Sequence, residues 1–187
     1  DHAFSGNLTP DNRIFSLDTQ RQVLGQHGLG DFRKPSIQIQ HGATEVTDFL
    51  YVGANIYSGS VEATGLPNPY SVDQAETLAL VFEDDQAAIR LTLYYTAYED
   101  RSTTTSFSKI ENCSDETVVI HKALSVLADV PAGDYDVITL QGAYAREKTV
   151  RRQQVEQGIF SISSNRGASG HAQTPALILA DHEVTED

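Results

Sequence analysis

The chain has 187 residues, of which 40% are apolar, so it is not a disordered tail and suits one folded domain, residues 1–187, around one core. Its 26 acidic and 13 basic residues give a formal net charge of -13, which repels phosphate backbones and anionic lipids and excludes nucleic acid as an expected partner. No apolar run reaches the roughly 18 residues of a membrane-spanning helix, so no membrane contact is expected.

The first half of the chain predicts short β-strands, beginning with residues 36–40 and 46–52. Residues 77–82 form another β-rich run. After the acidic, turn-forming residues 83–86, the alternation of apolar and polar side chains in 89–96 marks the clearest strand. The expected buried face of that strand carries Ile89, Leu91, Leu93 and Tyr95. We therefore predict that the last two runs form an antiparallel hairpin.

The second half repeats this pattern. Strands are expected at 107–111, 118–126 and 137–140, with turn-forming residues at 112–115 and 131–134 between them. Many short strands at this spacing favour an all-β fold, a large and mostly antiparallel β-sandwich.

Only residues 146–157 have the composition of a helix. Their Arg, Glu, Lys and Gln residues are good helix formers, but Val150 and Val155 alone make too narrow an apolar stripe. We therefore expect a long connection or an irregular strand there.

Cysteine and histidine offer no site for a metal or a nucleophile. Cys113 is the only cysteine, so an intrachain disulfide is impossible, and without a secretory segment this predicts a reducing, cytoplasmic location. Its turn has no cationic neighbour in sequence, so we expect an unreactive, structural thiol. The six histidines lack metal-ligand spacing. The chain contains no methionine, even at position 1, so we expect a piece of a longer protein.

Five segments, in order along the chain, resemble segments of the bacterial α-galactosidases of glycoside hydrolase family 36. They are Gly30-Asp31-Phe32-Arg33 before Pro35, Gly65-Leu66-Pro67-Asn68-Pro69-Tyr70, Ala75-Glu76-Thr77-Leu78, Gly142-Ala143-Tyr144-Ala145-Arg146-Glu147-Lys148, and Arg166-Gly167 with His171 and Pro175. The sequence departs from the family pattern at Tyr144, where Trp is usual, and at Ser106, Gly170 and Thr174.

The resemblance implies a supersandwich like that of galactose mutarotase, followed in the whole enzyme by a (β/α)₈ barrel and a small β-domain. The family's two catalytic Asp residues belong to the barrel, so no residue of this segment is expected to be catalytic. The implied reaction is the retaining hydrolysis of terminal α-galactosides such as melibiose and raffinose, with no cofactor and no metal. The implied assembly is a homo-oligomer, a tetramer, in which amino-terminal domains help to wall the active site.

The loop 25–33 provides the candidate substrate-binding residues, Asp31 and Arg33. Its glycines let the backbone enter a crowded cleft. In an extended run, Asp31 and Arg33 point to one face while Phe32 anchors the other face in the core. A carboxylate beside a guanidinium suits the adjacent hydroxyls of galactose. The alternative is that both residues only tie the loop to another domain.

Other aromatic and ionisable residues allow more than one interpretation. His171 and Glu147 are either an acid/base pair of the mutarotase kind or, as we favour, supports of a loop. Tyr144 and the pair Tyr94-Tyr95 are either sugar-stacking platforms or, more commonly at strand spacing, core or interface residues. The competing functions for the whole chain are a free-standing carbohydrate-binding module and a mutarotase-like isomerase.

Overall fold

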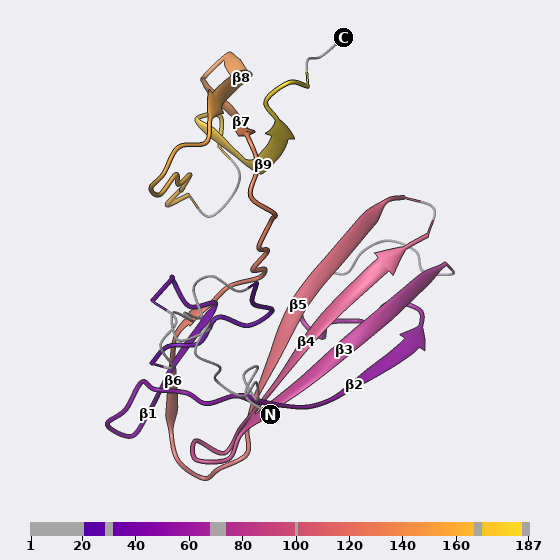
Figure 1. Ribbon diagram of the computed structural model, residues 1–187, viewed down its shortest axis with the longest axis vertical. Coiled ribbons are helices and arrows are strands. Elements are labelled where there is room, and N and C mark those ends of the chain that lie inside the picture. The colour runs from indigo at the N-terminus through magenta and orange to yellow at the C-terminus, as the bar shows by residue number, and fades with distance from the viewer. Residues whose placement is uncertain (1–20, 29–31, 68–73, 100, 167–169, 185–187) are drawn as a thin grey trace, which may run out of the picture. The chain divides into compact units, whose positions relative to one another are not determined.

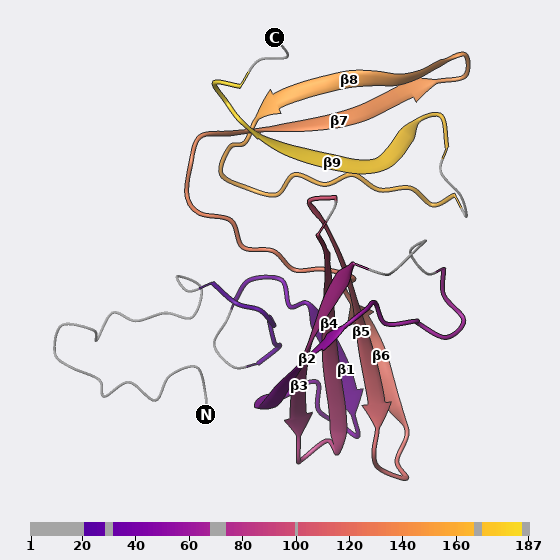
Figure 2. The same ribbon diagram turned by 90° about the vertical axis from the view of Figure 1, so that its right-hand side faces the viewer.

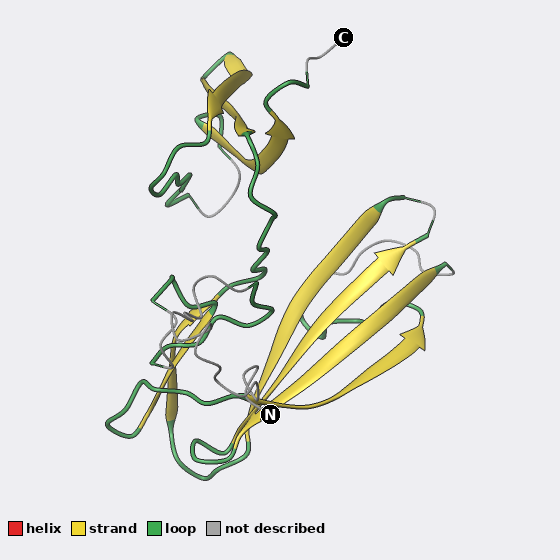
Figure 3. Cartoon of the chain, in the orientation of Figure 1, coloured by secondary structure: helices red, strands yellow, loops and turns green. Residues whose placement is uncertain are grey.

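The computed structural model describes residues 21–28, 32–67, 74–99, 101–166 and 170–184, and within them the chain consists of strands and loops (Figure 3). No helix in these ranges could cross a membrane. The strands are β1 (Ile37–His41), β2 (Leu50–Ser58), β3 (Ala75–Asp84), β4 (Ile89–Tyr98), β5 (Thr103–Asn112), β6 (Val118–Ala123), β7 (Tyr135–Ala143), β8 (Arg146–Gln154) and β9 (Gln173–Asp181). Their pairings are antiparallel, which confirms the predicted all-β class.

The chain divides into two compact units, Asp1–Asp129 and Val130–Asp187. The first unit contains a four-stranded sheet in the order β2-β3-β4-β5 and a two-stranded sheet of β1 and β6. Figure 1 shows β2 to β5 as a fan, with β1 and β6 paired as a separate ribbon.

An aliphatic cluster forms the core of the first unit. The predicted hairpin is confirmed, with β3 paired to β4 from Ala75↔Tyr98 to Asp84↔Ile89. The expected buried face of β4 is also correct at its start, because the exposed fraction of Leu91 is 1% and that of Ile89 is 2%. The cluster comprises Leu24, Ile37, Ile39, Phe49, Ala87, Ile89 and Leu91, with Phe82, Leu93, Ile110 and Val118 packed against it. It therefore joins β1 and β6 to one face of the four-stranded sheet.

The other face of the four-stranded sheet is less exposed than alternation predicts. Thr77 and Thr96 are buried there, and their hydroxyl oxygens lie 2.8 Å apart. The rings of Tyr94 and Phe107 stack beside them, with centroids 4.6 Å apart. These polar positions of β4 are therefore covered by hydrogen-bonded and aromatic neighbours that the strand pattern alone does not reveal.

The second unit is a three-stranded sheet in the order β8-β7-β9, which Figure 2 shows with β7 in the middle. Of the two alternatives expected at 146–157, a long connection or an irregular strand, the second is borne out over Arg146–Gln154 by β8, whose register with β7 shifts between Gln141 and Ala143. Ala145 and Lys148 have positive φ angles of 59° and 58° at this hairpin. All of β8 is exposed, which explains why its sequence carries so narrow an apolar stripe.

Several strand boundaries differ from the sequence prediction, since β5 begins at Thr103 and β6 ends at Ala123, and one strand was missed. The strand expected at 46–52 begins only at Leu50, as β2. The backbone of Phe49 is bound by the side chain of Gln26 and not by a strand partner. Phe49 N donates to Gln26 Oε1 at 2.6 Å, and Gln26 Nε2 donates to Phe49 O at 3.1 Å. The strand β9 was not predicted. It contains Pro175, which sheets tolerate at an edge, and β9 pairs only with β7.

Candidate functional site

The loop predicted to reach substrate is shaped by packing within the first unit. Gly28 has a φ of +93°, and a Cβ atom there would lie 2.7 Å from Val46 Cγ2. Gly25 is paired with Ser36, whose backbone nitrogen donates to Gly25 O at 2.9 Å. The requirement for glycine at position 28 is thus explained by local packing and backbone geometry. Asp31 lies outside the described residues.

Arg33 forms an ion pair inside the first unit. Its Nη1 lies 3.1 Å from Asp129 Oδ2, and the two side chains are 35% and 23% exposed. The same carboxylate oxygen accepts a hydrogen bond from the backbone nitrogen of Gln22 at 2.8 Å. Asp129 therefore holds two segments that are distant from it in sequence. This contact ties the loop within the first unit, whereas the tie to another domain stays a prediction.

The expectation that Phe32 anchors the loop in the core is wrong, because Phe32 is 90% exposed. The physical reason is that the chain around Phe32 is not a strand, so side chains there do not alternate between a buried and an exposed face. The core positions nearby are taken by Leu24 and Ile37 instead.

The contacts of the residues around the β7–β8 turn are those of a loop support, and the acid/base pair of Glu147 and His171 stays an untested alternative. Glu147 Oε1 accepts a hydrogen bond from its neighbour Ala145 N at 3.1 Å, which supports the turn. His171 contributes its backbone, since its carbonyl oxygen lies 3.0 Å from a Cβ built on Gly142. Tyr144 is 84% exposed, so its interpretation as a core residue is wrong. It remains a candidate for an interface or a ligand.

Cys113 is exposed, and its Sγ lies 3.8 Å from the carbonyl oxygen of Glu111. The unreactive character expected for this thiol stays a prediction.

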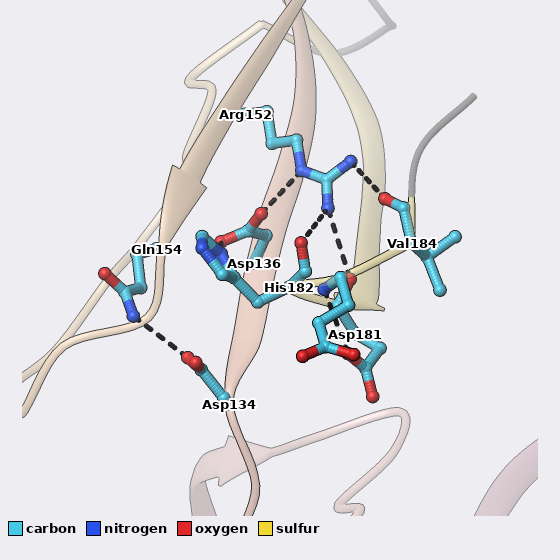
Figure 4. A network of polar contacts seen from close by, with 8 residues as sticks. Asp134, Asp136, Arg152, Gln154, Asp181, His182 and Val184 are labelled. Atoms are coloured by element: carbon cyan, nitrogen blue, oxygen red, sulfur yellow. Dashed lines mark hydrogen bonds and ion pairs between the residues drawn. The ribbon is translucent and has the colours of Figure 1, made fainter. Parts of the chain in front are cut away.

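A polar network in the second unit surrounds the carboxylate of Asp136 on β7, shown in Figure 4. Its side chain is only 5% exposed, and both of its oxygens are used. Arg152 Nε on β8 donates to Oδ2, and His182 Nδ1 lies 2.8 Å from Oδ1. The rest of the Arg152 guanidinium donates to the carbonyl oxygens of Asp181, His182 and Val184.

This arrangement shifts the proton affinities of two groups. The hydrogen bond to Asp136, and then the charge of that carboxylate, raise the pKa of His182 above its ordinary value of 6.5. The hydrogen bonds from His182 and Arg152 lower the pKa of Asp136 below its ordinary value of 3.8. The ion pair is therefore favoured between these two pH values.

The sequence offered only a weak indication that Asp136 lies in a polar network. Asp136 falls among the apolar residues of a strand, where a buried carboxylate needs a partner. Nothing in the sequence identifies that partner, because His182 is 46 positions away.

The geometry of the Asp136 group supports structure more directly than catalysis. Both carboxylate oxygens accept hydrogen bonds, and these hold Arg152 and His182 in place within the sheet. Among the residues that the structure describes, no group of three or more His, Cys, Asp or Glu side chains could hold a metal ion.

Comparison with known proteins places the chain in a family. The model of the glycosyl hydrolase family 36 N-terminal domain matches residues 2–187. Alpha-galactosidase AgaA of Geobacillus stearothermophilus is 40% identical over 190 residues, which cover 100% of this chain and 26% of that protein. Alpha-galactosidase Mel36A of Lactobacillus acidophilus is 34% identical over 190 residues, with the same coverage of 100% and 26%.

A crystal structure of a variant of the Geobacillus enzyme AgaA in complex with raffinose gives a TM-score of 0.87 at 39% identity, over 98% of this chain and 26% of that one. This similarity confirms the predicted large β-sandwich. The chain spans about a quarter of the length of these two relatives, 26% in each case. From the match over nearly its whole length, we conclude that the chain belongs to the N-terminal domains of glycosyl hydrolase family 36.

Proposed function

We propose that this chain is the non-catalytic amino-terminal domain of an α-galactosidase that hydrolyses terminal α-galactosides of the melibiose and raffinose type with retention. The observation that carries the proposal is the match of one family model to residues 2–187, across both compact units. It supports treating the two units as parts of one domain. The named α-galactosidases supply the reaction class, and the raffinose complex of a relative supplies the substrate class.

Retaining hydrolysis needs two carboxyl groups placed about 5 to 5.5 Å apart across a sugar. Three carboxylates of this chain, those of Asp136, Asp129 and Asp84, bind groups of the fold instead. Asp136 and Asp129 are engaged as described above, and Asp84 accepts backbone N–H groups through both of its oxygens. These engagements support a non-catalytic role, with the chemistry in another part of the enzyme.

The test is hydrolysis of an aryl α-galactoside by the purified chain and by the whole enzyme, at equal molar concentration. We expect release of the aryl alcohol by the whole enzyme and none by the chain above a tag-only control. Turnover by the chain alone contradicts the non-catalytic role, whereas an inactive whole enzyme contradicts the α-galactosidase assignment.

We further propose that the domain contributes to a homo-oligomer, a tetramer, and walls its active site in the cytoplasm. Exposed apolar side chains on the edge strand β9, namely Leu177, Ile178 and Leu179, support a role in assembly. Sedimentation of the whole enzyme tests this point. A monomer that retains full activity contradicts it.

The substrate role of Asp31 and Arg33 stays part of this proposal. The ion pair of Arg33 with Asp129 leaves two roles to separate, direct contact with the sugar and positioning of the loop. A variant of Asp129 separates these two roles, because it removes the ion pair that positions the loop and keeps the guanidinium of Arg33.

The alternative function is a module that binds carbohydrate without hydrolysing it. One observation favours it: the stacked rings of Tyr94 and Phe107 lie on the same sheet face as Tyr57. The pKa of Tyr57 is raised, first by burial and then by the nearby Tyr94. Aromatic rings on one face can stack on pyranose rings. Titration of the chain with melibiose, followed by amide chemical shifts, distinguishes the two. Saturable shifts in β2 and β4 favour the module, and unchanged spectra exclude it.

A further inference from the structure

The segment 181–184, which begins at the last residue of β9, is held by side chains of the two other strands of its sheet. Arg152 on β8 donates to the carbonyl oxygens of Asp181 at 3.1 Å, His182 at 3.2 Å and Val184 at 2.7 Å. Figure 4 shows the guanidinium facing this turn of the chain. One side chain thus donates to three backbone carbonyl oxygens of this segment.

Backbone contacts close the same turn. His182 N donates to Asp134 O at 3.0 Å, and Val184 N donates to Asp181 O at 3.1 Å. Glu183 N donates to Asp181 Oδ1 at 3.0 Å. The segment is therefore ordered by a few identifiable hydrogen bonds, and half of those named here are donated by Arg152.

Asp136 holds Arg152 in this position. Its nearly buried carboxylate accepts Arg152 Nε on one oxygen and faces His182 Nδ1 on the other. A carboxylate only accepts hydrogen bonds, so the Nδ1 atom of His182 carries the proton in this contact. His182 is 49% exposed, so solvent can exchange its second proton.

We propose that Asp136, Arg152 and His182 form a pH-sensitive latch that fixes the segment 181–184 where the chain leaves β9. This inference concerns the unit Val130–Asp187 alone and does not depend on the proposed function. The latch is closed when Asp136 is ionised and His182 is protonated. It loosens when either charge is lost.

The charged groups around His182 set the direction of the response. Asp136 on β7 and Asp134 just before it favour the imidazolium, and Arg152 on β8 opposes it. On its own segment His182 is flanked by Asp181 and Glu183. Because the acidic groups dominate, the protonated form persists above pH 6.5, the ordinary pKa of histidine. As the pH rises further, His182 loses its positive charge, whereas Arg152 keeps its own.

Hydrogen exchange of the His182, Glu183 and Val184 amides, measured by NMR in the whole chain and corrected for intrinsic exchange, tests the latch. We expect Arg152→Gln to accelerate exchange at these amides by about 10- to 100-fold, the equivalent of a lost charge-assisted hydrogen bond. Arg151→Gln is the matched control, because residue 151 precedes 152 on β8 and points to the opposite face. It removes the same charge and should leave exchange unchanged.

Amides in the centre of β7 report whether each variant is folded. If Arg152→Gln unfolds the sheet, Arg152→Lys is used, which keeps the charge but loses the planar fork, and it should still accelerate exchange. Equal exchange in wild type and in the folded position-152 variant overturns the proposal. An equal acceleration by Arg151→Gln also overturns it, since the effect would then be one of net charge.

A second pair of variants tests whether His182 causes the pH dependence of exchange in this segment. In wild type, corrected exchange at Glu183 and Val184 should increase as the pH rises through the raised pKa of His182. His182→Gln should remove this dependence, and His171→Gln, in the same unit, should retain it. If His182→Gln keeps the wild-type pH dependence, histidine does not operate the latch.

Discussion

The two units of the chain are stabilised in different ways. In the first unit, β1, β6 and the four-stranded sheet enclose a cluster of aliphatic side chains, with Ile39 fully buried and Leu91 1% exposed. In the described part of the second unit, Val137 is the one buried apolar side chain, and the buried centre of the sheet includes the carboxylate of Asp136. The first unit therefore relies on a hydrophobic core, and the second on a polar network.

This difference has consequences for how each unit responds to its surroundings. Burial of apolar surface is non-directional and independent of pH, so the first unit should tolerate changes of pH. A buried carboxylate is stable only with its partners in place, and those partners titrate. The second unit should therefore respond to pH and to the loss of single polar groups, and its exposed apolar strand β9 suits a surface that is covered in a larger assembly.

The largest expected effect is on the aliphatic cluster. Leu91→Ala should lower the free energy of unfolding of the first unit by about 2 to 5 kcal/mol, because it leaves a cavity in a packed core. Denaturant titration followed by hydrogen exchange in β4 measures this. Val119→Ala, at a position 46% exposed on β6, is the control and should change stability by less than about 0.5 kcal/mol. Equal losses in the two variants contradict a localised core.

A smaller effect is expected at the buried hydroxyl pair of the same unit. Thr77→Val removes the partner of Thr96 and the donor to Gly59 O, which Thr77 Oγ1 reaches at 2.7 Å. A buried acceptor left unsatisfied costs about 1 to 3 kcal/mol, and the shape of the side chain is retained. The same denaturant titration measures this loss. A neutral substitution would indicate that water replaces the hydroxyl.

The second unit should show the pH dependence that the first lacks. The stabilisation from His182, whose pKa is raised by its hydrogen bond to Asp136, is complete below pH 6.5 and is lost as the pH rises through the raised value. That from Asp136, whose pKa is lowered by His182 and Arg152, is complete above pH 3.8 and is lost as the pH falls through the lowered value. Hydrogen exchange in β7, measured from about pH 2 to 9 and corrected for intrinsic exchange, should thus be slowest between pH 3.8 and 6.5. A flat profile in β7, or the same profile in β4, contradicts the comparison.

The smallest effect on stability is expected at Arg33. Its partly exposed ion pair with Asp129 should contribute about 0 to 1 kcal/mol to the first unit. In the whole enzyme, Arg33→Ala should nevertheless lower kcat/KM by about 10- to 100-fold if the guanidinium contacts substrate. Asp129→Asn is the control for the tie. A loss of activity as large in Asp129→Asn as in Arg33→Ala, or wild-type kinetics in Arg33→Ala, would remove the substrate role.

Local sequence rules sufficed for much of the first unit. The period of two in 89–96 predicted both the strand β4 and its buried face, and the acidic residues after Phe82 predicted the turn from β3. Such features depend on neighbours within a few positions, so they can be derived from the chain alone. The same rules failed at Phe32, because they assume a strand where the chain forms a loop.

The sequence by itself determined the all-β class, the main hairpin and, through five ordered motifs, the family. Only the tertiary structure decided the partners of the polar groups. Arg33 meets Asp129 across 96 positions, and Asp136 meets His182 across 46. Many carboxylates of this acidic chain could pair with either cation, and strand register, which places β8 and β9 on the two sides of β7, selects among them. Alternation along a strand is a local property, whereas the choice of an ion-pair partner depends on which strands become neighbours when the whole sheet forms.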